Sequence, residues 1–298
     1  MKAVVQDRYG PPEVLRIDEV ERPVPKPGEI LVRVRASTVS QSDTHMRRAD
    51  PVLWRLFLGL RRPRRRLRLG VELAGEVEEV GADVTAFRTG DEVFGHPSTW
   101  SGAHQEYVCI REDAPLAHKP ASLTFEQAAA VCDGAAQAFA ALRAAGAGEG
   151  CHIVIYGASG SLGTAAVQLA RHVGARVTAV CGSAHVELIR SLGADEVVDY
   201  RQEDFTSRGP VYDAIVDAVG KYSFRRARRA LKPGGVYVET DGIGILWWPL
   251  VTRLVGSRRF RTAGARRNKA DVLLLKELIE AGEFRPVVDR CYPMAEVV

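Results

Sequence analysis

The fold of this chain is decided by the stretch Ile153-Val-Ile-Tyr-Gly157-Ala-Ser-Gly160-Ser-Leu-Gly163. It joins a short apolar run, typical of a buried strand, to residues 162–173, whose apolar side chains recur on one helical stripe. Gly157 permits a tight exit from the strand, Gly160 lets the backbone approach a pyrophosphate, and Gly163 lets helix and strand pack closely. The amides at the head of the helix attract phosphates. The stretch therefore predicts a dinucleotide-binding turn.

Strands and helices alternate around this turn. The expected strands are residues 152–156, 176–181, 196–199, 212–217 and 235–240, and the expected helices are 162–173, 184–192 and a segment near 223–231. The strands are nearly continuous runs of Val and Ile, which is typical of a parallel sheet covered on both faces. The sequence predicts an α/β fold, with a Rossmann doubly wound parallel sheet over residues 125–265.

The first part of the chain has a different pattern. Strand-like runs occur at residues 1–7, 29–36, 75–80 and 103–110, with Pro- and Gly-rich turn signals between them. We expect a β-rich domain over residues 1–124, ending where Thr124 caps a helix. We expect residues 266–298 to return to this domain, with a helix over residues 269–280 and an extended segment over 285–292.

The composition narrows the class of protein. The chain has 298 residues, of which 46% are hydrophobic and 26% charged, as in a soluble globular protein of one or two domains. Its apolar runs are shorter than the roughly 18 residues that cross a bilayer, so we expect no membrane span. The five cysteines are scattered and form no C-x-x-C pair. This pattern argues against a disulfide framework and favours a reducing, cytoplasmic location.

Basic residues are concentrated in residues 55–68, which hold seven arginines among apolar side chains. One interpretation is a patch for nucleic acid or an anionic membrane. The other is a solvated arginine face over an apolar strip that packs on the protein. We favour the second, because a single basic run is weak evidence for nucleic-acid binding, and expect no nucleic-acid partner.

The end of the second expected strand bears on the choice of cofactor. NAD sites usually place Asp or Glu there, to bind the ribose hydroxyls. Here the strand ends in Val180-Cys-Gly-Ser183, with no carboxylate. The small polar side chain of Ser183 leaves room for a 2′-phosphate. Tyr200, at the end of the third strand, could stack or hydrogen-bond nearby, although a buried core tyrosine is its ordinary role. We therefore expect NADP(H).

Further motifs follow in order along the chain. They are Gly90-Asp-Glu-Val-Phe-Gly95, Gly102-Ala-His-Gln-Glu-Tyr-Val108, the glycine turn, Ser191-Leu-Gly-Ala-Asp-Glu-Val-Val-Asp-Tyr200 and Leu231-Lys-Pro-Gly-Gly235. Together they resemble the zinc-independent quinone oxidoreductases of the medium-chain dehydrogenase/reductase superfamily, over essentially the whole chain. The resemblance implies a GroES-like β-rich catalytic domain beside the Rossmann domain, a homodimer, and NADPH-dependent reduction of a quinone or enone-type acceptor.

The resemblance also implies which residues form the site. We expect the cofactor to contact Gly134, Gly157, Ala158, Ser159, Gly160, Ser161, Leu162, Gly163, Ser183, Tyr200, Val219 and Gly242. A basic residue that often follows Ser183 in the family is Ala184 here, which weakens the preference for NADPH. The positions that bind catalytic zinc in alcohol dehydrogenases of this fold are Ser40, Val71 and Cys132. One thiol cannot hold zinc, so no metal is expected.

Without a metal, the protein must align the two reacting rings and stabilise charge on the acceptor oxygen. His45 stands where the family often has a tyrosine, and its imidazole can donate to this oxyanion. A histidine with a surface or core role is the equal alternative. Ser40 could also donate, although capping a turn is its more ordinary role. Asp43 is expected to fix its own loop as an Asx-turn rather than to act as an acid.

Two other functions stay open. An enoyl-thioester reductase could use the arginines of residues 55–68 to bind a phosphopantetheine or CoA phosphate. A non-catalytic NADPH-binding regulatory or interaction protein would account for the missing family groups and for an exposed-looking Leu246-Trp-Trp248. Residues 244–255 could pair in a dimer or fold back on their own domain. The family normally closes with a further helix and strand after the position of Val298, and we expect folding or activity to suffer without them.

Overall fold

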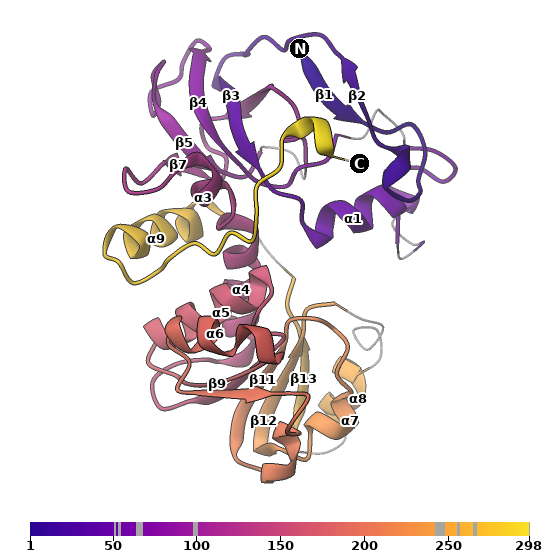
Figure 1. Cartoon of the computed structure of the whole chain (residues 1–298), viewed down its shortest axis with the longest axis vertical. Coiled ribbons are helices and arrows are strands. Elements are labelled where there is room, and N and C mark those ends of the chain that lie inside the picture. The colour runs from indigo at the N-terminus through magenta and orange to yellow at the C-terminus, as the bar shows by residue number, and fades with distance from the viewer. Residues whose placement is uncertain are drawn as a thin grey trace. The chain divides into compact units, whose positions relative to one another are not determined.

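The computed structural model describes residues 1–50, 52, 55–63, 68–97, 101–241, 248–254, 257–264 and 267–297. They form two compact units (Figure 1). The first comprises residues 1–132, 267–280 and 286–298, and the second comprises residues 133–266 and 281–285. The boundary lies between residues 132 and 133, later than the boundary predicted at residue 124. The reason is that the short helix α3 (Phe125–Ala129) packs on strands of the first unit.

The second unit is built on a parallel six-stranded sheet. The strands lie in the order β10-β9-β8-β11-β12-β13, which is the strand order of a Rossmann fold. Their bounds are β8 (His152–Tyr156), β9 (Arg176–Cys181), β10 (Glu196–Asp199), β11 (Tyr212–Asp217), β12 (Leu231–Glu239) and β13 (Arg259–Thr262). From β8 the chain adds β9 and β10 on one side, and from β11 it adds β12 and β13 on the other side. The turn after β8 therefore lies at the change of direction, where ligands bind in open α/β sheets.

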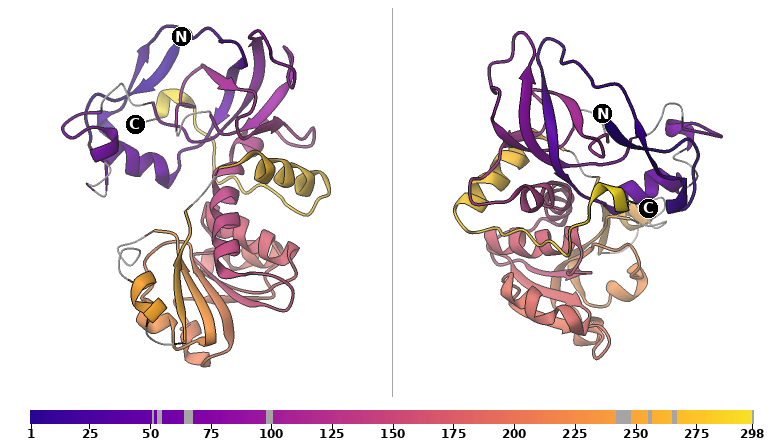
Figure 2. Two further views of the ribbon diagram at one scale, coloured as in Figure 1. Left: turned by 180° about the vertical axis from the view of Figure 1, so that it is seen from behind. Right: turned by 45° about the horizontal axis from the view of Figure 1, so that its top comes forward.

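Helices cover both faces of this sheet. In Figures 1 and 2, α5 (Ser161–His172) and α6 (Val186–Ser191) lie on one side, while α7 (Phe224–Ala227) and α8 (Trp248–Leu254) lie on the other. The helix α4 (Cys132–Ala145) leads into β8. The strand β13 and the helix α8 were not predicted. β13 has the sequence Arg-Phe-Arg-Thr, whose single apolar residue shows neither a run nor an alternation that marks a strand.

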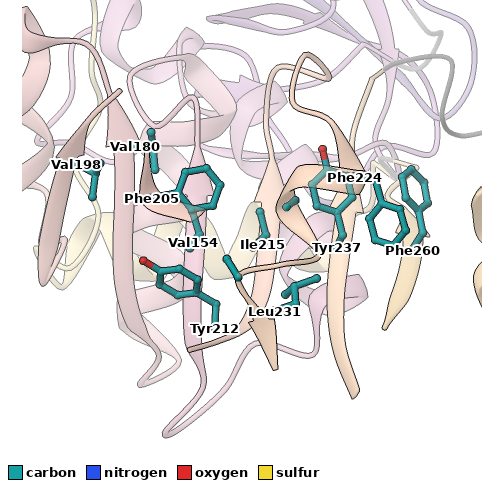
Figure 3. Close-up of a cluster of buried hydrophobic side chains, with 12 residues drawn as sticks. Val154, Val180, Val198, Phe205, Tyr212, Ile215, Phe224, Leu231, Tyr237 and Phe260 are labelled. Atoms are coloured by element: carbon teal, nitrogen blue, oxygen red, sulfur yellow. The ribbon is translucent and has the colours of Figure 1, made fainter. Parts of the chain in front are cut away.

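An aromatic cluster fills the α7–α8 face of the sheet. Figure 3 shows its side chains, which come from neighbouring strands and the helices above them: Val154, Val180, Val198, Phe205, Tyr212, Ile215, Phe224, Leu231, Tyr237 and Phe260. Trp248 packs against this cluster, with its ring centroid 5.1 Å from that of Phe224. The expectation that Trp248 is exposed is therefore wrong, because α8 turns it onto the sheet; Leu246 and Trp247 lie outside the described residues.

The first unit is mainly β-structure. A five-stranded antiparallel sheet has the order β6-β3-β4-β5-β7, and a separate two-stranded sheet pairs β1 with β2. The bounds are β1 (Lys2–Val5), β2 (Arg16–Glu19), β3 (Glu29–Ser37), β4 (Leu73–Val80), β5 (Glu92–Gly95), β6 (Tyr107–Arg111) and β7 (Leu116–His118). The returning helix α9 (Lys269–Glu280) packs beside β7, and Lys269 Nζ donates to the carbonyl of Glu112 at 2.8 Å.

Two helices in this unit were not predicted. They are α1 (Gln41–Arg48) and α2 (Arg55–Leu58). Ser40 caps α1, and Ser40 and Asp43 form a reciprocal capping box. This capping box replaces the Asx-turn predicted for Asp43, whose carboxylate accepts from the Ser40 amide instead. The same Ser-x-x-Asp spacing starts a helix, and the polar sequence of α1 hid the period that would have revealed it.

Candidate functional site

The glycine turn has the close contacts that its sequence predicts. Gly157 has a φ of +80°, and a Cβ placed there would lie 2.2 Å from Cγ2 of Val219. A Cβ on Gly163 would lie 2.3 Å from the carbonyl oxygen of Gly157 and 2.6 Å from Cα of Ala158. Neither position accepts a side chain, because the clashes at Gly163 are with backbone and Gly157 also has a left-handed conformation. The two glycines therefore hold β8, the turn and α5 together.

Gly160 differs from its neighbours, because the space beside it is open. Among the described residues other than its chain neighbours, the nearest atom to a Cβ placed there would be the Gly157 carbonyl oxygen, at 3.7 Å. Gly160 is the N-cap of α5 and has no side chain with which to cap it. The amides of Ser161, Leu162 and Gly163 are the first three of the helix, so they lack acceptors within it. An exposed helix start with bare amides next to open space fits a phosphate group.

Other predicted cofactor residues of this unit gather around the turn. Gly134, in α4, would bring a Cβ within 2.4 Å of Ser161 Oγ, so its glycine lets α4 pack against the start of α5. Ala158 is buried, and its amide donates to the carbonyl of Val180 at 3.0 Å. Ser159 lies half-buried in the turn, between Ala158 and the exposed Gly160. Gly242 lies outside the described residues.

The ends of β9 and β10 meet at Ser183. Its hydroxyl donates to the carboxylate of Asp199, the last residue of β10, at 2.5 Å. The amide of Arg201 donates to the other oxygen of Asp199 at 3.0 Å. The Ser183 hydroxyl and then the Arg201 amide lower the pKa of Asp199, so the group is ionised at neutral pH. A carboxylate therefore does stand beside the end of β9, supplied by the neighbouring strand rather than by β9 itself.

Tyr200 follows Asp199 and is 52% exposed. A Cβ on Gly182 would lie 3.4 Å from its hydroxyl, so the ring lies against the segment that ends β9. Arg201 lies with its guanidinium carbon 6.0 Å from the centroid of the same ring. Ser183 and Tyr200 thus lie near the same ends of β9 and β10, where Asp199 and Arg201 also lie.

Asp217, which the sequence did not single out, organises the loop after β11. The side chain is fully buried and accepts from the amides of Val219, Gly220 and Tyr222 at 2.8–3.0 Å. The hydroxyl of Tyr237 donates to it at 2.9 Å. These bonds hold Val219 over Gly157. The signal that could have found Asp217 is a carboxylate at the end of an apolar strand, directly before Ala-Val-Gly.

The predicted catalytic residues lie in the first unit, where Asp43 is the most buried of them. Asp43 is 2% exposed. One carboxylate oxygen accepts from the amide and the hydroxyl of Ser40, both at 2.9 Å, and the other accepts from the amide of Gly70 at 2.7 Å. The carboxylate therefore joins the start of α1 to the segment before Val71. Its bonds account for a structural role, and the Ser40 hydroxyl proton is committed to it.

His45 lies in the last turn of α1 and is half-buried. Its Nδ1 lies 2.7 Å from the carbonyl oxygen of Asp50, and its Nε2 lies 3.1 Å from Nε2 of Gln41. Because a carbonyl only accepts, Nδ1 carries the proton in the neutral ring and Nε2 accepts from Gln41. The neutral imidazole has no proton left at Nε2, so only the imidazolium can donate from there.

The positions that correspond to zinc ligands have other surroundings. Ser40 caps α1, Val71 is completely buried in an apolar cluster with Met46 and Leu69, and Cys132 is buried at the start of α4. Across the described ranges, no three His, Cys, Asp or Glu side chains are grouped as a metal site would need.

The basic stretch at residues 55–68 is only partly described. The Arg55 guanidinium lies over the ring of Tyr9, 5.4 Å from its centroid, and Leu58 packs against the cluster of Val71. Arg68 donates to Gln105 Oε1 at 2.6 Å. Leu56 and Leu60 are exposed, and Trp54 and Arg64 to Arg66 lie outside the described residues. The described part therefore combines packed and solvent-facing side chains.

Comparison with known proteins finds two family matches along the chain. Residues 26–149 match the family described as alcohol dehydrogenase GroES-like domain, and residues 192–298 match the family described as zinc-binding dehydrogenase. The mitochondrial NAD(P)H oxidoreductase RTN4IP1 of Mus musculus is 33% identical, over 100% of this chain and 84% of the relative. The 2-methylene-furan-3-one reductase of Solanum lycopersicum is 30% identical, over 97% of this chain and 71% of the relative.

A solved structure supports the same assignment. The quinone oxidoreductase from Coxiella burnetii matches 100% of this chain and 93% of its own, with a TM-score of 0.88 and 28% sequence identity. Among the described helices, none has both the length and the hydropathy that a membrane span requires. The GroES-like unit, the Rossmann sheet and these relatives agree. The chain therefore belongs to the quinone oxidoreductase-like family of the medium-chain dehydrogenase/reductase superfamily, as an oxidoreductase with a nicotinamide cofactor.

Proposed function

We propose that this protein is an NADPH-dependent, zinc-independent reductase of quinone or enone-type acceptors. The observation that carries the proposal is the open space beside Gly160 at the uncapped head of α5. A bound nicotinamide would supply hydride to an acceptor carbon, and the acceptor oxygen would take a proton from water or a side chain. The relatives support the acceptor class, since they include a quinone oxidoreductase and a furanone reductase.

The residues of the second unit would bind and orient the cofactor. The amides of Ser161, Leu162 and Gly163, with the positive end of the α5 dipole, would receive the pyrophosphate. The loop that Asp217 holds would support the cofactor through Val219. Because these groups are fixed by packing before the cofactor arrives, binding loses little conformational entropy.

The preference for NADPH rests on the surroundings of Ser183. The Ser183 side chain is small and leaves room for a 2′-phosphate. Ala184 stands where the family often has a basic residue, and Arg201 offers a positive charge in its place. The nearby Asp199 carboxylate opposes a 2′-phosphate, so the guanidinium must outweigh it. We expect the NADPH dissociation constant to lie below that of NADH, and Arg201→Ala to narrow the difference. Titrations in which wild-type protein bound NADH more tightly would overturn the preference.

The absence of zinc from the proposed mechanism follows from the donor set. A hydroxyl that caps a helix, a buried valine and one thiol offer a single good ligand for zinc. Metal analysis of purified protein is expected to find no stoichiometric zinc. One zinc ion per chain would contradict the proposal.

The acceptor is tested by NADPH oxidation with quinones, enones, aldehydes and enoyl-CoA esters, repeated with NADH. The proposal expects the highest kcat/KM with a quinone or enone. A saturable preference for enoyl-CoA would assign the chain to the enoyl-thioester reductases instead. Tight NADPH binding without oxidation by any acceptor would point to a non-catalytic binding protein.

His45 is proposed to face the acceptor and, as the imidazolium, to donate a proton from Nε2. We expect His45→Ala to reduce kcat several-fold with little change in cofactor affinity, because the described partners of its ring, Gln41 and Asp50, are not among the residues proposed to bind cofactor. Gln41→Ala is a second test, because it removes the group beside Nε2 and leaves the imidazole in place. Stopped-flow measurement of NADPH oxidation checks the effect. Unchanged turnover would remove His45 from the site.

A homodimer is proposed through β13 and α8. β13 is the last strand of the described sheet, and Leu250 and Val251 on α8 are 66% and 45% exposed. An edge strand beside exposed apolar side chains is a common surface for pairing two copies. Sedimentation equilibrium is expected to give twice the 32.5 kDa chain mass. A mass equal to one chain would refute the dimer.

A cytoplasmic location is proposed because none of the five cysteines forms a disulfide. The relative RTN4IP1 is named mitochondrial, which is a statement about that protein. Fractionation of the native cells tests the location, and recovery in an organelle would contradict it.

A further inference from the structure

Glu239 is a buried acid that the proposed mechanism does not use. It is the last residue of β12, is 6% exposed, and its Oε2 has no hydrogen-bond partner within the described part of the chain. A buried polar atom without a partner is costly, so it needs a physical explanation. A ligand that completes its hydrogen bonds is one such explanation.

The sheet places Glu239 on the edge that carries the glycine turn. Glu239 pairs in register with Asp217 of β11, and Asp217 pairs with Tyr156 of β8, the residue directly before Gly157. All three strands are parallel, so their last residues share one edge. Two strand spacings separate β8 from β12, which is about 10 Å. This places Glu239 within the span of a dinucleotide that starts at the turn.

The strand order indicates which half of the dinucleotide lies there. The adenosine ribose of such cofactors lies at the end of the strand that follows the glycine turn, here β9. β9 and β12 lie on opposite sides of β8 in the sheet. With the pyrophosphate on the turn, the nicotinamide half therefore extends toward β11 and β12. This step rests on the proposed function.

The surroundings of Glu239 favour its protonated form, so that this form is well populated at neutral pH. Burial raises the pKa of Glu239 to about 7, and the carboxylates of Asp217 and Asp241 add to the shift. On β12, Tyr237 lies two residues earlier on the same face and bonds to Asp217, and Tyr156 ends β8. On β13, Thr262 pairs with Glu239 and carries no charge.

A protonated carboxyl both donates and accepts, whereas a carboxylate only accepts. The nicotinamide carboxamide has the complementary pair, a carbonyl oxygen and an amino group. Asp217 is excluded from this role, because it already accepts four hydrogen bonds. We propose that Glu239 binds the nicotinamide carboxamide, donating from its protonated oxygen to the amide oxygen and accepting from the amide nitrogen.

The test compares two ligands across pH 6 to 9 by isothermal titration calorimetry. One is NADPH and the other is 2′-phospho-ADP-ribose, which shares the adenosine 2′-phosphate and pyrophosphate but lacks nicotinamide. Above the pKa of Glu239 the donor is lost. The dissociation constant of NADPH divided by that of 2′-phospho-ADP-ribose is therefore expected to rise with pH in the wild-type protein. Above the pKa of Glu239 the rise approaches tenfold per pH unit. Glu239→Gln keeps a donor at every pH and is expected to give a flat ratio.

Two further variants separate binding from folding. Glu239→Leu is expected to weaken NADPH at every pH and leave 2′-phospho-ADP-ribose unchanged, and the exposed Glu187→Gln is expected to behave as wild type. A flat wild-type ratio, or normal NADPH affinity in Glu239→Leu, would overturn the role of Glu239. Failure to bind either ligand would instead contradict the proposed cofactor site.

Discussion

Replacing Gly160 with alanine is expected to weaken NADPH binding by about 100-fold, which corresponds to about 2.7 kcal/mol, without unfolding the protein. Within the described part of the chain, the nearest non-neighbouring atom to the new Cβ would be 3.7 Å away, and Gly160 has a φ of −79°, so alanine fits the fold. The methyl group would instead occupy the space beside the amides of Ser161 and Leu162. Phosphates could then no longer approach the backbone closely. Fluorescence titration with NADPH measures the loss.

Gly163→Ala is the matched comparison within the same turn. Its Cβ would lie 2.3 Å from a backbone oxygen, so it is expected to destabilise the second unit rather than to change affinity selectively. Circular dichroism and thermal unfolding separate the two variants. If Gly160→Ala bound NADPH as tightly as wild type, the open space beside Gly160 would not be the phosphate site.

Replacing Asp43 with alanine is expected to lower the free energy of unfolding of the first unit by about 3–5 kcal/mol. The substitution removes acceptors for the amide and hydroxyl of Ser40 and for the buried amide of Gly70. It also removes half of the capping box at the start of α1. Hydrogen exchange read by mass spectrometry is expected to show faster exchange over residues 41–48 and around Gly70.

The Asp43 prediction also decides between two roles. Asp43→Asn keeps one acceptor oxygen and is expected to lose about half as much stability, with turnover following the folded fraction. If Asp43→Ala were as stable as wild type but inactive, the carboxylate would have a chemical role that its hydrogen bonds do not suggest.

The Rossmann unit could be predicted closely because its signals are local. β8, β9, β10 and β11 have the predicted bounds, since each is an apolar run between turn residues. The first unit was harder to predict. The helix α1 is polar and short, and it depends on the Ser40–Asp43 pair and on contacts with Gly70 that lie far away in the sequence.

The candidate site likewise has one part that the sequence predicts and another part that it does not. Residues 157–163 are contiguous, so their spacing reveals the turn. Asp199 and Asp217 were missed because each acts on groups that the sheet, not the sequence, brings near. Ser183 follows β9 and Asp199 ends β10, and only the pairing of the two strands places these side chains together. The unpaired oxygen of Glu239 likewise has no sequence signature.

A crystal structure of the protein with NADPH bound would show whether the head of α5 is the pyrophosphate site. We expect density for the two linked phosphates on the amides of Ser161, Leu162 and Gly163, with the adenosine half over the ends of β9 and β10. Density for the dinucleotide elsewhere, with the space beside Gly160 empty, would contradict it.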